Sequence, residues 1–235
     1  MKRLWMVCLL TYFAFVVIMT VTRPGRCTAA TKAASTNVRL DSVQGLEVVD
    51  GTARVETYQG RRAVHLVSPA NATEASSPLA IIGGSNFKDG TIELEVAGAP
   101  RPGTDPGNRG FIGVAFRVQD HGSRGEYFYL RPTNGRAGDQ LRRNHSVQYE
   151  SLPEFPWYRL RKESPGVYES YADLEPGVWT KMKVVVSGTK AQLYVNDAPQ
   201  PCLIVNDLKL GDSRGQVALW AYGGTDGYFS NLTVQ

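Results

Sequence analysis

Apolar and polar residues alternate along most of the chain beyond about residue 45, in short runs that are broken by Gly, Pro, Asn and Asp. These runs are rich in β-branched and aromatic residues, which favours strands over helices. We predict strands at 46–49, 53–58, 63–67, 79–82, 91–97, 111–118, 126–131, 146–151, 179–186, 191–196, 215–222 and 228–234. The tetrapeptide SGTK at 187–190 lies between two of them and predicts a tight hairpin.

Many short strands with almost no helical periodicity indicate an all-β protein, and the most economical arrangement is an antiparallel two-sheet sandwich. The strands do not repeat as one unit, so a propeller is not expected. Residues 38–235 are enough to form one large domain with a substantial core. We therefore predict a single β-sandwich over that range.

The first thirty residues have the order of a secretory signal: Lys2 and Arg3 precede an apolar run from Leu4 to Val21, and small residues follow. We predict a signal peptide over 1–30, a flexible lead-in over 31–37, and a secreted or periplasmic product. Because the apolar run is long, an uncleaved membrane anchor is the alternative. No other membrane contact is expected.

Charge and cysteine content exclude several classes of protein. Of the 26 Lys and Arg residues, the four at positions 2, 3, 23 and 26 lie in the leader, so the remaining 22 balance the 22 Asp and Glu. A neutral chain lacks the basic surface that nucleic acid requires. Cys8 and Cys27 lie in the leader and Cys202 stands alone, which excludes a disulfide framework and a cysteine zinc site. We expect no cofactor, although Ca²⁺ held in a turn stays open.

Three consecutive strands, at 111–118, 126–131 and 146–151, carry unusual outer faces. Because side chains alternate along a strand, Phe116 and Val118 should face the core and Arg117 should face outward. If the strands are neighbours, their outer faces merge into one surface. That surface would hold Phe111, Gly113, Ala115, Arg117, Tyr127, Tyr129, Arg131, Asn144, Ser146, Gln148 and Glu150.

Such a surface suits a saccharide, because aromatic rings pack on sugar C–H faces while Arg, amide and carboxylate groups bond hydroxyls. An ordinary amphipathic solvent face is the alternative. The next segment, 152–178, lacks alternation but is rich in aromatic residues. Long loops of this kind tend to be functional. We expect it either to fold over the polar face and complete a cleft, or to cap one end of the sandwich.

Our central geometric hypothesis is that Arg117, Arg131, Gln148 and Glu150 project into one hollow that the 152–178 segment roofs. Further ligand contacts are expected from this segment and from the turn before the 146–151 strand. The complete set of expected ligand-binding residues is Arg117, Tyr127, Tyr129, Arg131, Arg142, Asn144, Gln148, Trp157, Tyr158 and Tyr168.

Several strings, in this order, resemble concanavalin A-like, laminin G-like jelly-roll domains over roughly residues 80–235. They are FKDGTIELEVAG, GFIGVAFRVQD with EYFYLRP, WTKMKVVVSGTKAQLYVND, and GQVALWAYGGTDGYFSNLTV. The resemblance implies a jelly-roll fold and leaves activity open, since that fold serves many functions.

A narrower resemblance is to the secreted bacterial 3-keto-disaccharide hydrolase family. It rests on Val147-Gln148, Gly166-Val167-Tyr168 and Gly177-Val178-Trp179. It implies cleavage of 3-keto-glycosides, which can begin with removal of a proton next to the ketone. That step needs a base and an electrophile to hold the oxyanion.

Glu150 and His145 are the candidate catalytic bases, and Arg131 or Arg142 is the candidate electrostatic partner. We favour Glu150, because alternation places His145 on the core side with Val147. The string ESYADLE at 169–175 resembles the paired carboxylates of laminarinase-type enzymes, but its spacing is wrong and we discount it.

Taken together, the residues favour a carbohydrate-recognising domain with a glycan-binding concave face. An enzyme of the 3-keto-disaccharide hydrolase type is the first alternative, and a structural or protein-interaction domain of the cell envelope is the second.

Overall fold

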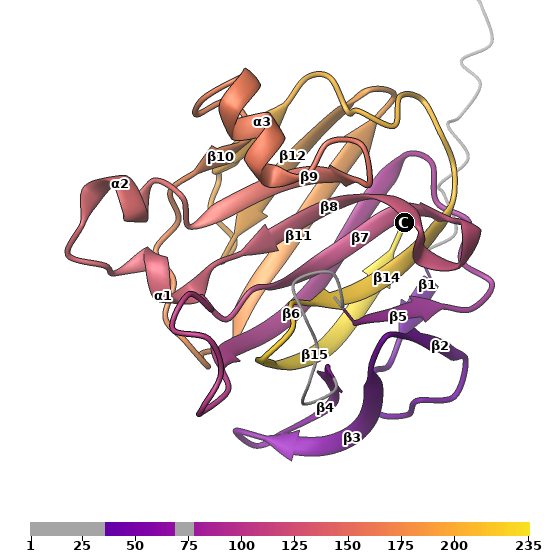
Figure 1. Cartoon of the computed structure of the whole chain (residues 1–235). Coiled ribbons are helices and arrows are strands. Elements are labelled where there is room, and N and C mark those ends of the chain that lie inside the picture. The colour runs from indigo at the N-terminus through magenta and orange to yellow at the C-terminus, as the bar shows by residue number, and fades with distance from the viewer. Residues whose placement is uncertain (1–35, 69–77) are drawn as a thin grey trace, which may run out of the picture. The chain divides into compact units, whose positions relative to one another are not determined.

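The computed structural model describes residues 36–68 and 78–235, which belong to one compact unit. Two antiparallel sheets make up the described chain (Figure 1). Sheet A has the strand order β13-β12-β11-β6-β15-β4-β3, with β1 added on β15, and sheet B has the order β10-β9-β8-β7-β14-β5-β2. This is the two-sheet β-sandwich that the strand pattern predicts.

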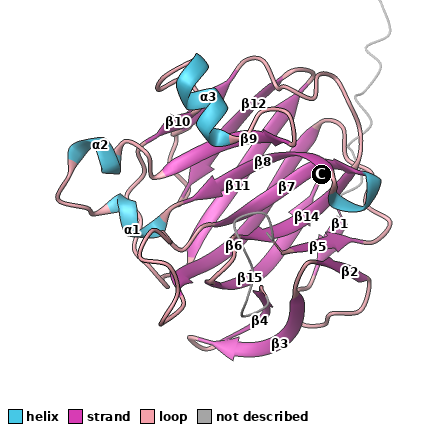
Figure 2. Cartoon of the chain, viewed as in Figure 1, coloured by secondary structure: helices cyan, strands magenta, loops and turns pink. Residues whose placement is uncertain are grey.

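The strands of sheet A are β1 (Thr36–Val38), β3 (Thr52–Tyr58), β4 (Arg61–Val67), β6 (Gly90–Pro100), β11 (Thr180–Ser187), β12 (Lys190–Val195), β13 (Leu203–Val205) and β15 (Thr225–Val234). Those of sheet B are β2 (Leu46–Val49), β5 (Leu79–Ile82), β7 (Ile112–Gln119), β8 (Arg124–Leu130), β9 (Val147–Leu152), β10 (Glu169–Ser170) and β14 (Gln216–Ala221). Short helices lie between strands: η1 (Asp120–Gly122), α1 (Pro132–Gly135), α2 (Gln140–Arg143) and α3 (Trp157–Glu163) (Figure 2).

The expected signal peptide at 1–30 lies outside the described residues, as does the lead-in at 31–35. Thr36 and Asn37, which we had assigned to the lead-in, instead form β1 and pair with β15. Within 36–68 and 78–235, none of the helices is long and apolar enough to cross a membrane.

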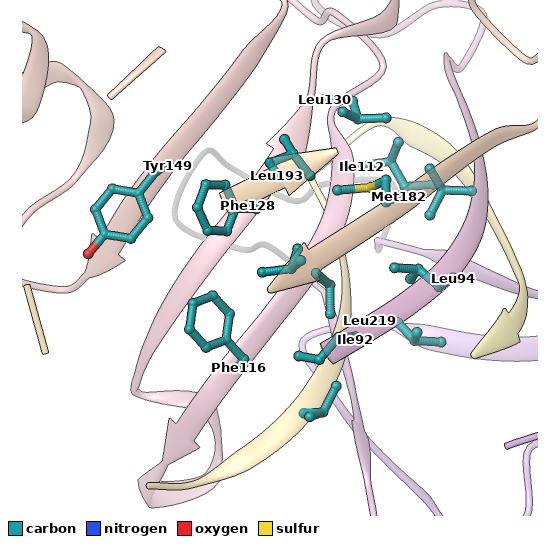
Figure 3. Close-up of a cluster of buried hydrophobic side chains, with 14 of the residues drawn as sticks. Ile92, Leu94, Ile112, Phe116, Phe128, Leu130, Tyr149, Met182, Leu193 and Leu219 are labelled. Carbon is teal, nitrogen blue, oxygen red and sulfur yellow. The ribbon is translucent and has the colours of Figure 1, made fainter. Parts of the chain in front are cut away.

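The main core fills the space between the two sheets (Figure 3). Ile92, Leu94, Met182 and Leu193 enter it from sheet A, while Ile112, Phe116, Phe128 and Leu219 enter it from sheet B; all are buried. Alternate residues of facing strands supply these side chains, which is how aligned sandwiches build their interior.

Arg117 does not face outward, so this part of our hypothesis is wrong. The pairing of β7 with β8 shifts register between Phe116 and Gln119, and Arg117 has a φ of 52°. Such a bulge reverses the alternation. Arg117 is therefore fully buried at the end of the sandwich, where it donates to the carbonyls of Lys88, Gly188 and Gly211.

Val118, which we expected in the main core, is displaced by the same bulge. It joins a second apolar cluster with Leu79, Ile81, Ala115 and Tyr127. This cluster lies on the face of sheet B that points away from the main core.

The 152–178 segment is not a plain loop. After Pro156 it forms α3, which contacts β9, and it then adds the two-residue strand β10 to the edge of sheet B. In Figure 1, α3 lies next to β9 and β10. The segment therefore builds a wall at the β9 edge.

Candidate functional site

Cross-strand pairing aligns the outer-face residues of sheet B in two rows. The first row runs Glu169, Gln148, Tyr129, Gly113 and Trp220 across β10, β9, β8, β7 and β14. The second runs Glu150, Tyr127, Ala115 and Ala218. Directly paired residues share a face, so Gln148, Glu150, Tyr127 and Tyr129 lie together, as alternation predicts.

The aromatic residues of these rows form a floor rather than an open surface. Tyr127 and Tyr129 are each 2% exposed and Trp220 is 3% exposed. Gly113 lies between Tyr129 and Trp220, and its missing side chain lets their rings approach to 4.8 Å. The two tyrosines therefore leave a ligand almost no surface to contact in this structure.

Gln148 is also buried in the floor. Its Nε2 donates to the carbonyls of Tyr149 and Tyr168, and its Oε1 has no hydrogen-bond partner among the described residues.

One buried carboxylate, that of Glu169, contacts several polar side chains at the β9–β10 edge. Arg161 reaches both of its oxygens, with Nε 3.0 and 3.1 Å away and Nη2 2.5 Å from Oε2. His145 Nδ1 lies 2.8 Å from Oε2, and Arg131 Nη1 lies 3.8 Å from it. We call these four residues the Glu169 cluster. A carboxylate that is only 3% exposed needs such partners, because removing an unpaired charge from water is costly.

Trp157 lies between two members of the cluster. The centre of its ring is 4.7 Å from the Arg161 guanidinium and 5.7 Å from that of Arg131, within cation–π range. Arg131 also donates to the hydroxyl of Tyr129 and to the carbonyl of His145. These contacts hold Arg131 and Trp157 in place, yet Trp157 remains 40% exposed.

An open pocket of about 620 Å³ adjoins the cluster. It is lined by Leu141, Asn144, His145, Arg161, Pro165, Gly166, Glu169, Ser170 and Tyr171. Asn144 and His145 were among our candidates, whereas Arg161, Glu169 and Tyr171 were not. The pocket thus lies at the β9–β10 edge of sheet B, whereas the expected site was the centre of the sheet.

His145 does not face the core, contrary to our expectation. Strand β9 begins only at Val147, and His145 belongs to the turn that follows α2, so strand alternation does not apply to it. Its imidazole lines the pocket instead.

Tyr168 was expected to contact ligand but belongs to the main core. Its ring centre is 5.6 Å from that of Tyr149, and its hydroxyl donates to Asp207. The two-residue strand β10 begins directly after Tyr168, and its Glu169 takes the outward position.

The remaining candidates lie around the cluster. Arg142 donates from Nε to the side-chain oxygen of Asn134. Asn144 accepts from Gln140 at the pocket edge. Tyr158 is 63% exposed and meets Trp157 edge to face.

Burial shifts the pKa values of two titratable groups here. It raises the pKa of Glu150 from about 4.5 to about 7. The backbone N–H of Trp157, which donates to Glu150 Oε2, and the charge of Arg131 oppose this shift. Burial also lowers the pKa of His145 below its ordinary value, while Glu169 acts in the opposite direction. A carboxyl group whose pKa lies near neutrality is suited to proton transfer, and the lowered pKa of His145 favours the neutral imidazole, which can accept a proton.

Within residues 36–68 and 78–235, no group of three or more His, Cys, Asp or Glu side chains could hold a metal ion. Cys202 is a half-buried free thiol, and burial raises its pKa to about 11.

No protein-family model and no curated protein matches this chain. Solved structures do match. A carbohydrate-binding module, CBM66, from Bacillus subtilis is 15% identical, with a TM-score of 0.54 over 81% of this chain and 96% of the module. A Bacillus subtilis protein of unknown function with a galectin-like fold is 11% identical, with a TM-score of 0.55 over 85% and 94%. A β-glucanase from Bacillus licheniformis is 10% identical, with a TM-score of 0.51 over 87% and 99%. At these identities the matches show the fold alone, which is the jelly-roll sandwich.

Glu150 should make the stability of the protein depend on pH. Its folded pKa of about 7 lies above the unfolded value, so its stabilising contribution is complete at pH 4 and is lost as the pH rises to 7. The loss amounts to about 3 kcal/mol at most. We expect Glu150→Gln to flatten this part of the profile and to exceed the wild type in stability at pH 8. Urea unfolding of the wild type and of Glu150→Gln at pH 5, 6, 7 and 8 measures the slope of the profile and the difference in stability at pH 8.

Glu154→Gln is the matched control, because Glu154 is exposed on the same segment and should leave the profile unchanged. Equal pH slopes for the wild type and Glu150→Gln would show that Glu150 is not the titrating group.

Proposed function

We propose that this domain recognises carbohydrate, and that the sugar binds in the pocket beside the Glu169 cluster and against Trp157. The observation that carries this proposal is the combination of exposed aromatic rings with fixed polar groups at one edge of sheet B: Tyr171 lines the pocket, and Trp157 lies against Arg161, which also lines it. Trp157 and Tyr171 are 40% and 38% exposed. Arg161 donates hydrogen bonds to both carboxylate oxygens of Glu169, which fixes the two side chains.

This combination matches what a sugar ring offers. Its C–H faces pack on aromatic rings, and its hydroxyls require donors and acceptors that are already oriented. The contacts within the cluster fix Arg161 and His145 before a ligand arrives, so little side-chain entropy remains to be lost on binding. A plain solvent-facing sheet would not need such fixed polar groups.

The fold is compatible with this role, since one matching solved structure is a carbohydrate-binding module and another has a galectin-like fold. We further propose that the protein is secreted or periplasmic, on the basis of the charged, apolar and small-residue order of positions 1–30. The balance of basic and acidic residues beyond that leader argues against a nucleic-acid partner.

Removing either exposed ring should weaken sugar binding without unfolding the protein. We expect Trp157→Ala and Tyr171→Ala each to lower affinity about tenfold, because each deletes a stacking surface. Glycan-array screening followed by calorimetry with the best sugar measures the loss, and thermal unfolding checks the fold.

Tyr194→Ala is the matched control, since Tyr194 lies on sheet A beneath the Lys183 ammonium, a ring–cation pair like that of Tyr171 and Arg143. Unchanged affinity in both Trp157→Ala and Tyr171→Ala would place the sugar elsewhere. Failure of the wild type to bind any glycan, with retention in envelope pull-downs, would favour the protein-interaction alternative.

A second candidate function, cleavage of a 3-keto-glycoside, is favoured by the pairing of His145 with Glu169. His145 Nδ1 lies 2.8 Å from Glu169 Oε2, and this carboxylate favours the tautomer with the proton on Nδ1, in which Nε2 has the lone pair and can act as a base. A base takes the proton from the carbon that lies between the ketone and the anomeric carbon, and the electron pair moves to the ketone oxygen, where a guanidinium can stabilise it. When the ketone re-forms, a double bond forms to the anomeric carbon, the glycosidic C–O bond breaks, and the leaving oxygen takes up the proton that the base holds. His145 is better placed than Glu150 for this role, because Glu150 is almost fully buried and its carboxylate accepts the backbone N–H of Trp157.

Turnover of a 3-keto-glucoside should then depend on His145. We expect His145→Gln to reduce kcat by about a hundredfold or more, as followed by product release. His121→Gln is the control, because His121 is exposed and pairs with Glu47 away from the pocket. Full turnover in His145→Gln would remove His145 from the mechanism, and absence of turnover in the wild type would leave the binding role alone.

A further inference from the structure

Positive charge is concentrated around the pocket. Arg161 lines the pocket, and Arg131 lies behind it in the Glu169 cluster. Arg143 contacts the ring of Tyr171, which also lines the pocket. The Arg143 guanidinium is 4.9 Å from the centre of the Tyr171 ring, and its Nη2 donates 2.8 Å to the Tyr171 hydroxyl. One guanidinium, that of Arg161, thus lines the opening, and those of Arg131 and Arg143 lie behind and beside it. Glu169 is the one carboxylate among the described lining residues.

Two more arginines reinforce this charge from behind. Arg142 donates to Asn134 and Thr133, and Arg109 donates to backbone carbonyls. Burial, together with the nearby guanidiniums of Arg142 and Arg131, lowers the pKa of Arg109, while the Asp105 carboxylate acts in the opposite direction. The like charges are therefore close enough to repel one another. In the described part of the chain, Arg109, Arg142 and Arg143 have no carboxylate within 4.0 Å.

The acidic residues of this region already have other partners. Asp173 and Glu175 pair with Arg136, and Asp173 also attracts Arg143 from a longer distance. Asp139 accepts the backbone N–H of Arg142 at the start of α2 and keeps its charge. Glu150, with a pKa of about 7, carries only part of a charge at neutral pH. Of the guanidiniums beside the pocket, that of Arg143 therefore has no carboxylate within 4.0 Å among the described residues, and Tyr171 is its neighbour through both ring and hydroxyl.

We infer that the ligand of this pocket is an anionic glycan, a sugar that carries a carboxylate or sulfate group; this inference rests on the proposed function. The anionic group contacts the Arg143 guanidinium beside Tyr171, while the sugar ring lies against the aromatic side chains. Guanidinium is suited to this task, because its planar fork donates two parallel hydrogen bonds to a carboxylate or sulfate. A neutral sugar would leave the Arg143 guanidinium without an anionic partner.

The test is a panel of immobilised oligosaccharides in which each uronate is paired with its methyl ester and each sulfated sugar with its desulfated form. The two arms separate carboxylate from sulfate as the source of the charge. We expect at least tenfold tighter binding of the charged member of one pair. Arg143→Gln should remove most of this difference, and Arg143→Lys should restore part of it. Added salt should reduce it as well, because Arg143 lies at the solvent edge.

Arg62→Gln is the matched control, since it deletes an equal charge from an exposed position at the start of β4 in sheet A. Equal binding of charged and neutralised members, with loss of both in Tyr171→Ala, would overturn the anionic ligand and leave the carbohydrate site intact. Absence of binding to every member of the panel would overturn both.

Discussion

The site depends on the burial of one carboxylate. Glu169 is almost removed from solvent, and a charge in that position is tolerated only if oppositely charged or hydrogen-bonding groups surround it. Arg161, His145 and Arg131 meet that requirement from three different segments: α3, the turn after α2, and the end of β8. The same contacts attach these segments to the edge of sheet B and leave His145 and Arg161 facing the pocket.

Floor and wall of the site have different physical origins. The floor, with Tyr129, Gly113 and Trp220, follows from regular pairing of β8, β7 and β14, and it is packed like a core. The wall follows from the two-residue strand β10, whose pairing sets Glu169 opposite Gln148. A rigid sheet thus supports polar side chains that a loop alone would not hold in register.

The sequence was a good guide where regular alternation holds and a poor one where it stops. The longer strands, the adjacency of β7, β8 and β9, and the shared face of Gln148 and Glu150 follow from period-two patterning. The short strands β1, β10 and β13 were not predicted, because two or three residues are too few to show a period. Arg117 was misplaced because a bulge reverses the pattern without a sequence signal that we recognised. Glu169 was missed because its partners are set by tertiary pairing, and ESYADLE was judged only as a spaced carboxylate motif.

The most direct test of this account is the titration of His145 by NMR in the wild type and in Glu169→Gln. The account predicts a His145 pKa below the ordinary value in the wild type, and a lower one still in the variant, because burial and the two arginines remain while the opposing carboxylate is lost. His121, whose pKa is raised by Glu47, serves as the internal reference and should not change. An unchanged His145 pKa in Glu169→Gln would contradict the cluster on which the site is built.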